Sequence, residues 1–285
     1  MRLKYLRVAG LTIGGLIIGG IALLHTPPAK RMALGRLQSA LAAQGIRFEA
    51  SSLDFNLLNL SASLRGVVMQ LEASLPPLAK IESVAMQLSM RDLILGHVVV
   101  TNATFQKPQI CLVIDANGLT NLPKSKGSQG EALDFLVLNA AFNEGSITVD
   151  DRRDGLKVVL PQWDVQVEGS RITRRHRAEF RTRRDGLVEY GARVYAVQML
   201  QATLDVGNSD AKLERVALRT TGVALDGSLH VVDFEKYGLD GKFRISGEVD
   251  RFLAEAGGRV EADVLIQGTA ALPKAVSYTH LRAHE

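Results

Sequence analysis

The chain has 285 residues, of which 46% are hydrophobic and 22% charged, a composition that is ordinary for a folded protein and argues against general disorder. Its net charge of +4 suits a membrane surface or nucleic acid only weakly when spread over this length. A single cysteine, Cys111, excludes an internal disulfide framework, and we expect it to act as a small buried hydrophobe.

The first 27 residues are predicted to form a transmembrane anchor. No charged residue occurs between Val8 and Leu24, and Arg2, Lys4 and Arg7 precede this run. About 17 residues in a helix span about 26 Å, close to the thickness of a hydrocarbon core. A cleaved signal peptide is the alternative, but the run is longer than a usual signal core and lacks a clean cleavage site. We therefore expect an uncleaved single-pass anchor with a cytoplasmic N-terminus.

A short amphipathic helix is predicted to follow the anchor, over residues 28–45. Leu34, Leu37 and Leu41 fall on one face of this helix, and Gly45 suits its end.

Strand patterns dominate residues 46–275. In the stretch from Leu239 to Asp250, apolar and polar side chains alternate with the two-residue period of a strand that has one wet and one dry face. No helical patterns of 10–15 residues alternate with the strands, which argues against a doubly wound α/β sheet. The candidate apolar face, taken from three such stretches, comprises Val84, Met86, Leu88, Met90, Leu239, Phe243, Ile245, Val249, Val260, Val264 and Ile266.

Periodicity does not say what covers this dry face. A second sheet could cover it in a sandwich, the sheet could close on itself as a filled barrel, or it could curl into an open trough that something other than protein completes. Because an anchor precedes an almost helix-free run of half-apolar strands, we expect the third arrangement. The predicted fold is thus mainly β: an elongated, curled, antiparallel-rich sheet with an apolar groove.

No constellation of catalytic or metal-binding residues is evident. The chain lacks the nucleophile elbow, the zinc-protease and phosphate-loop motifs, and the dinucleotide fingerprint, so we expect neither an enzyme nor a cofactor. Asp150, Asp151 and Asp154 cluster, but Arg152 and Arg153 interleave them, which favours a charged hairpin tip over a metal site.

A run of seven arginines lies between residues 171 and 184. The simplest interpretation is a solvated strand pair whose charges discourage aggregation at an edge. Phospholipid headgroup contact at a groove rim is the alternative, with Arg174, Arg175 and Arg177 as candidates, because guanidinium pairs well with phosphate. We do not expect a nucleic-acid partner for an anchored extracytoplasmic segment.

The last ten residues, 276–285, depart from the preceding pattern and resemble one reading frame of a transposon sequencing adapter. We expect them to be foreign to the protein and the native chain to continue past Ala275.

Three consecutive motifs between Met90 and Pro123 resemble a segment of the AsmA-like family, its TamB-type members in particular. They read "MRDLILG", "HVVVTNATFQKPQI" and "VIDANGLTNLP". The stretch "RTTGVALDGSLHVVDFEKYGLDGKFRISGEVDRFL" resembles a later element of that family.

The resemblance implies a protein anchored in the bacterial inner membrane, with its bulk in the periplasm and an apolar groove in a long β-sheet. It implies a role in moving phospholipid toward the outer membrane. A role in assembling outer-membrane or secreted β-proteins with an outer-membrane partner is the first alternative, and an anchored β-sandwich scaffold is the second. The family supplies no catalytic residues.

Overall fold

The computed structural model describes residues 26–43, 45–71, 75–95, 97–121, 135–234, 238–248, 258–269 and 272–282. Within these ranges, no helix is both long and apolar enough to cross a membrane. Residues 1–25 of the predicted anchor lie outside the described residues, as does Val249 of the predicted apolar face. The anchor therefore stays a prediction.

The helix predicted over residues 28–45 is confirmed as α2, Pro27–Ala43. It ends before Gly45, whose φ of +79° lies in the left-handed region that glycine adopts without strain. Leu34 and Leu41 pack against the first strands of the sheet, whereas Leu37 is exposed. The apolar face of α2 is thus narrower than the sequence pattern suggests.

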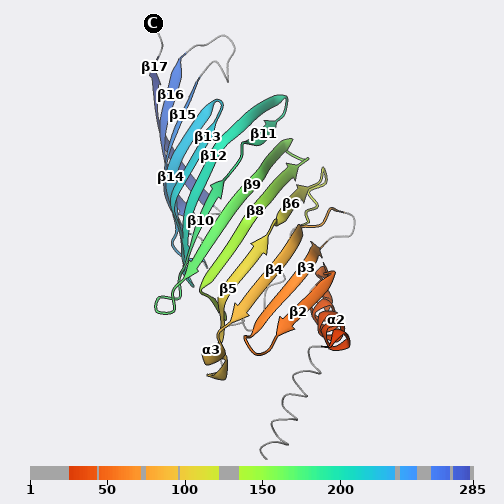
Figure 1. Cartoon of the computed structure of the whole chain (residues 1–285). Helices are drawn as coiled ribbons and strands as arrows, with labels where there is room; N and C mark the ends of the chain where they lie inside the picture. Colours follow the sequence, from red (N-terminus) through yellow and green to blue (C-terminus); the bar gives the residue numbers. More distant parts are fainter. Residues whose placement is uncertain are drawn as a thin grey trace, which may run out of the picture.

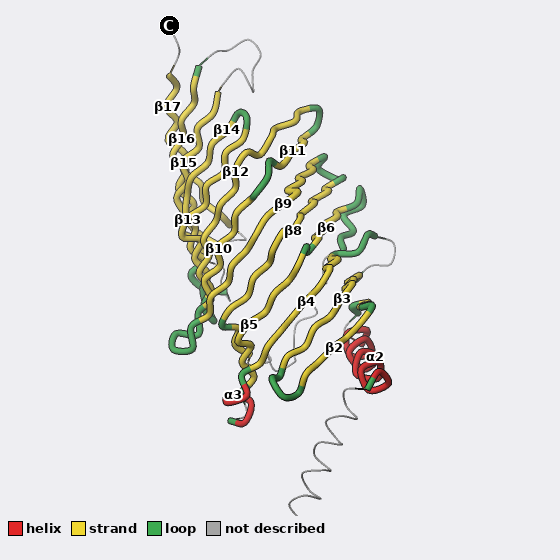
Figure 2. The backbone as a smooth tube through the Cα atoms, viewed as in Figure 1, coloured by secondary structure: helices red, strands yellow, loops and turns green. Residues whose placement is uncertain are grey.

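The described strands form one 17-stranded sheet, drawn in Figures 1 and 2. Their bounds are β1 Arg47–Glu49, β2 Ser52–Asn56, β3 Ser61–Gln70, β4 Ala79–Leu88, β5 Val98–Gln106, β6 Gln109–Ile114, β7 Phe135–Val137, β8 Asn139–Asp151, β9 Leu156–Gly169, β10 His176–Thr182, β11 Gly186–Tyr190, β12 Arg193–Val206, β13 Ala211–Thr220, β14 Val223–Val231, β15 Gly238–Glu248, β16 Arg259–Thr269 and β17 Leu272–Arg282. The prediction of a mainly β chain with few helices is confirmed.

Most neighbouring strands are antiparallel, and short turns join several of them, as between β8 and β9, β11 and β12, and β13 and β14. The exception lies in the middle of the sheet, where β5 and β6 lie in line and both pair with β7–β8 in parallel. Parallel pairing requires the chain to return along the sheet between the paired strands, and 20 residues separate β6 from β7. The sheet is therefore mixed.

The return begins in a turn formed by the third family-like motif. The Asp115 carboxylate accepts hydrogen bonds from the N–H groups of Asn117 and Leu119 at 2.8 and 2.7 Å. Gly118 has a φ of +80°. The fully buried Asn121 accepts a hydrogen bond from the Val113 N–H at 2.9 Å and donates to two backbone carbonyls. The predicted turn is confirmed, and its polar residues hold the backbone.

A short helix that the strand pattern did not predict, α3 (Met90–Ile94), interrupts the expected apolar face. Ser89 caps it by accepting a hydrogen bond from the Asp92 N–H at 3.3 Å. β4 ends at Leu88, so the prediction that Met90 continues the β4 face is wrong. The Ser-x-x-Asp spacing of residues 89–92 is a helix-start signal that would have indicated this change.

The described strands form a single layer, so the sandwich considered from the sequence is not what these residues form. β17 pairs with β16, β1 and β2 pair with β3, and β17 has no register with β1 or β2.

The C-terminal strand β17 includes residues predicted to be foreign to the protein. It pairs in register with β16 over its whole length. Over residues 276–278 its polarity is inverted, since Ser277 lies opposite Val264 while Val276 and Tyr278 are exposed on the other face. The foreign origin of residues 276–285 stays a prediction.

Candidate functional site

Two adjacent rows of apolar residues cross the sheet from β2 to β16. Within each row, every member is the direct cross-strand partner of the next. The first apolar row is Leu53, Leu64, Val84, Phe105, Phe142, Val165, Phe180, Ala202, Val216, Gly227, Phe243 and Val264. The second apolar row is Phe55, Ala62, Met86, Ala103, Ala140, Val167, Ala178, Leu204, Leu213, Leu229, Gly241 and Ile266.

The rows are continuous because the strand registers bring distant residues together. Phe105 and Phe142, for example, stack with ring centroids 4.3 Å apart at the parallel β5–β8 pairing. A bulge in β13 lets both Leu213 and Val216 join the apolar rows although three positions separate them. An unbroken apolar surface therefore runs across the described strands.

At a spacing of about 4.8 Å per strand, the rows extend for about 50 Å. One leaflet of a bilayer has a hydrocarbon depth of about 15 Å, half of a ~30 Å core. The surface is thus several times longer than one acyl chain. Its dimensions suit a path along which chains lie better than a pocket for one small ligand.

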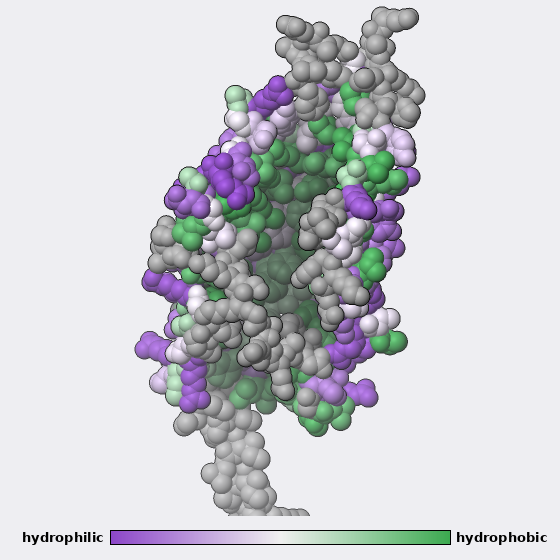
Figure 3. Space-filling view, turned by 180° about the vertical axis from the view of Figure 1, so that it is seen from behind, coloured by the Kyte–Doolittle hydropathy of each residue, from purple (hydrophilic) through white to green (hydrophobic). Residues whose placement is uncertain are grey.

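The apolar surface is covered at one end and open at the other. Near β2–β4, Leu34 and Leu41 of α2 pack on a cluster that includes Leu64 and Val84. From β14 to β16, in contrast, no hydrophobic side chain of the described residues is buried, and Phe243 and Val264 are only half-buried. Figure 3 shows this face as a hollow with an apolar lining and polar margins.

An aromatic cluster lies in the middle of the surface. Trp163, the single tryptophan of the chain, is 3% exposed and lies 6.4 Å from the Phe142 ring and 5.7 Å from the Phe180 ring. A Cβ atom at Gly145 would lie 2.4 Å from the Trp163 ring, so the indole packs directly on the Gly145 backbone. The buried indole N–H has no hydrogen-bond partner within the described residues. Trp163 is consequently a built-in spectroscopic reporter of this surface.

Most of the predicted lining residues lie on this face. Val84, Phe243 and Val264 belong to the first apolar row, and Met86 and Ile266 belong to the second. Leu239, Ile245 and Val260 lie on the same face of β15 and β16, opposite Val231, Leu225 and Gly247 respectively. Leu88 follows a register shift at the end of β4.

The sequence prediction missed the central part of the surface, in β5, β8, β9 and β10. Phe142, Val165 and Phe180 were not selected, although alternation is visible around the last two in "WDVQVEG" and "AEFRT". Phe142 precedes a register shift, and the parallel partner that places it beside Phe105 is distant in sequence.

The predicted headgroup arginines lie at or beside β10, where carboxylates bind two of them. Arg175 binds both Asp205 and Asp210, through distances of 2.8 and 3.1 Å to the latter. Arg177 binds Glu214 at 2.7 Å from the polar face. Hydrogen bonds from Arg175 lower the pKa of Asp210, which keeps this pair charged. These ion pairs favour the solvated strand pair over headgroup binding for Arg175 and Arg177, and headgroup contact stays a prediction.

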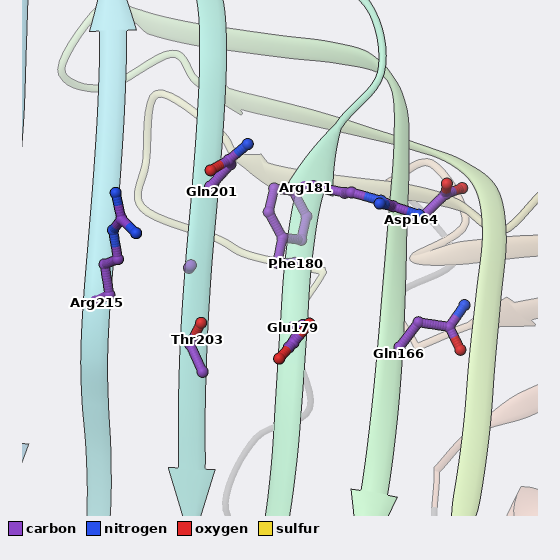
Figure 4. Close-up of a pocket in the computed structure, with 9 residues that line it drawn as sticks. Asp164, Gln166, Glu179, Phe180, Arg181, Gln201, Thr203 and Arg215 are labelled. Carbon is purple, nitrogen blue, oxygen red and sulfur yellow. The ribbon is translucent and has the colours of Figure 1, made fainter.

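The polar face of the sheet carries a shallow hollow of about 300 Å³ across β9, β10, β12 and β13, shown in Figure 4. A cross-strand row of Gln166, Glu179, Thr203 and Arg215 lines it. Beside this row, Asp164 binds Arg183 at 2.5 Å. Hydrogen bonds from the Glu144 N–H and Arg183 lower the pKa of Asp164 although burial acts to raise it.

The acidic cluster at the β8–β9 turn forms the predicted charged hairpin tip. Arg152 binds Asp150 at 2.9 Å, and Arg153 binds Asp154 at 3.2 Å. The Asp151 carboxylate accepts two backbone N–H groups of the turn. Across the ranges given above, no three His, Cys, Asp or Glu side chains converge as a metal site would require.

Comparison with known proteins adds no assignment, since no family model and no curated protein matches the chain.

Proposed function

We propose that this protein is a lipid-transfer protein, anchored in the bacterial inner membrane with its sheet in the periplasm, that moves phospholipid toward the outer membrane. The observation that carries the proposal is the pair of apolar rows, continuous for about 50 Å and open over β14–β16. The AsmA-like sequence motifs support it independently.

The proposed mechanism is passive. Acyl chains lie along the two apolar rows, where contact requires apolar area more than directed bonds. The charged headgroups stay at the polar margin and keep their hydration, because moving an unpaired charge into an apolar site is costly. No covalent step is involved.

A pair of adjacent residues on β16 provides a direct test. Val264 belongs to the first apolar row, whereas Leu265 points to the opposite face and is exposed. A carboxylate at residue 264 opposes acyl chains, and one at residue 265 meets water. We expect Val264→Asp to reduce the phospholipid that co-purifies with the full chain by about tenfold or more, and Leu265→Asp to leave it within about twofold.

Folding is measured in the same samples by far-UV circular dichroism. An equal loss of lipid in both variants would overturn the proposal. So would a loss of folded protein that fully accounts for the loss of lipid in Val264→Asp, since this would indicate a sealed core.

The single tryptophan gives a second test. Full-length protein is reconstituted with phospholipid carrying bromine on its acyl chains, and Trp163 emission is recorded. Because the predicted anchor contains no tryptophan, quenching reports acyl chains near the sheet surface and not near the anchor. Unchanged emission at saturating brominated lipid would contradict occupancy of the central part of the surface.

A further inference from the structure

A group of exposed apolar side chains projects from one end of the strands and does not belong to the two apolar rows. It consists of Met90, Leu93, Ile94, Leu95 and Ile172, and we call it the α3 knob. Ile94, Leu95 and Ile172 are 77%, 64% and 94% exposed. Four of these residues come from α3 and its C-terminal cap, and Ile172 comes from the β9–β10 turn.

Side-chain hydrogen bonds hold the two parts of the α3 knob together. Arg171 donates hydrogen bonds to both carboxylate oxygens of Asp92 at 2.8 Å, across 79 positions of sequence. The Asp92 N–H also donates to the Ser89 hydroxyl that caps α3, and the Asp92 side chain is only 13% exposed. Hydrogen bonds from Ser89 and Arg171 lower the pKa of Asp92, so the clamp is charged at neutral pH. The clamp holds the two apolar turns side by side.

The charge beside the α3 knob is positive. Arg91, Arg171 and Arg174 stand against the single carboxylate of Asp92 in residues 89–95 and 170–174. Exposed aliphatic side chains flanked by arginine are the combination that interfacial membrane-binding segments use: the apolar groups enter the acyl boundary and the cations meet anionic headgroups.

The α3 knob also lies on the edge at which the chain leaves the predicted anchor. The β2–β3 turn on this edge exposes Leu58 at 73%. Near the start of α2, Lys30 binds Asp54 at 2.7 Å, two residues before β2 ends, so α2 begins beside the same turn. Figure 1 shows α2, the β2–β3 turn and α3 at the lower end of the molecule. The described part of the chain begins at Thr26, two residues after the uncharged run of residues 8–24, and enters α2 at this edge.

The opposite strand ends have a different character. The β8–β9 turn there carries Arg152, Arg153 and Asp154, and the segment after β10 carries Arg183 and Arg184. Two exposed apolar residues, Tyr190 and Val194, lie on this side at the β11–β12 turn. Both edges carry arginines, but among the described residues the second edge exposes fewer large apolar side chains, so it offers a matched control.

We infer that the α3 knob is a membrane-docking surface that binds the anionic phospholipid surface of the bilayer holding the anchor. The inference rests on the membrane location in the proposed function, but not on lipid occupancy of the apolar rows. Docking at this edge would give the sheet a contact with the bilayer beside the predicted anchor and so restrict the tilt of the sheet.

The test uses full-length protein in nanodiscs, with Cys111 replaced by alanine so that single labelling sites can be introduced. Ile94→Cys places an environment-sensitive fluorophore on the α3 knob, and Val194→Cys places it at an exposed apolar position on the opposite edge. In discs containing 30% phosphatidylglycerol, we expect a blue shift and at least about threefold quenching by near-headgroup spin-labelled lipid at residue 94 but not at residue 194. We expect a smaller change in pure phosphatidylcholine.

Arg171→Glu breaks the clamp and reverses one charge, and we expect it to reduce the quenching at residue 94 by more than half. The inference is overturned by a water-exposed label at residue 94 in anionic discs or by equal changes at residues 94 and 194. Equal quenching with and without phosphatidylglycerol also overturns it, as does a blue shift that depends on protein concentration, because this would indicate a second copy. Quenching of Trp163 by phospholipid with brominated acyl chains is recorded in parallel. This measurement distinguishes a failure of membrane docking from a failure of the proposed lipid binding along the apolar rows.

Discussion

The packing of Trp163 on Gly145 leads to a prediction whose sign depends on the partner residue. A Cβ atom at residue 145 would lie 2.4 Å from two atoms of the indole ring and 2.8 Å from a third, closer than real Cβ contacts allow. The φ angle of Gly145 is not in the left-handed region, so an alanine backbone fits without strain. The three atoms nearest to an added Cβ all belong to this ring.

The expected magnitude follows from two opposing effects. Overpacking against the ring costs about 1–3 kcal/mol, and removing a glycine from a strand returns about 0.5–1 kcal/mol. Gly145→Ala should therefore lower the free energy of unfolding by about 0.5–2 kcal/mol. Trp163→Ala removes the whole ring, so Gly145→Ala in that background should raise the free energy of unfolding by about 0.5–1 kcal/mol.

Urea unfolding followed by far-UV circular dichroism, applied to the wild type, both single variants and the double variant, measures this coupling. The Trp163→Ala variant serves as its own reference, because its loss of about 3–5 kcal/mol from the missing ring cancels in the comparison. An effect of Gly145→Ala that is the same in both backgrounds would refute the described packing of β8 on β9.

Three further outcomes are expected. Asn121→Leu leaves a buried N–H and two carbonyls without partners and should lower the free energy of unfolding by about 2–4 kcal/mol, whereas the exposed Asn117→Ala should change it by less than about 0.5 kcal/mol; urea unfolding checks both. Arg175 lowers the pKa of Asp210 from its ordinary 3.8, so the stability from this pair is present above pH 3.8 and is lost as the pH falls through the lowered pKa. Thermal unfolding midpoints measured between about pH 5 and 2 should therefore fall more steeply for the wild type than for Asp210→Asn. Burial raises the pKa of Cys111, so at pH 8 a thiol reagent should modify the folded protein at least about tenfold more slowly than the urea-unfolded protein, and equal rates would contradict its placement in β6.

The sequence prediction of the fold succeeded where the pattern is local. Alternation in residues 239–248 and 259–267 predicted β15, β16 and the face on which Phe243 and Val264 lie. Proline near the start and glycine after the end predicted α2. It failed at α3, where apolar residues at 88 and 90 continue a strand period while Ser89 and Asp92 start a helix. The hydrogen bonds of the cap outweigh the alternation there.

The sequence by itself determined which side chains of each strand share a face, because successive residues in a strand point in opposite directions. Only the tertiary structure decided how these faces align, since register is set between strands that are distant in the chain. Phe105 meets Phe142 through a parallel pairing that no local pattern encodes. The tertiary structure also decided that the described strands form one layer and leave the apolar residues of β14–β16 only half-buried. A two-residue period indicates that one face of a strand is apolar. The same residues can line a closed core or an open surface. Which of the two they line depends on the path of the whole sheet.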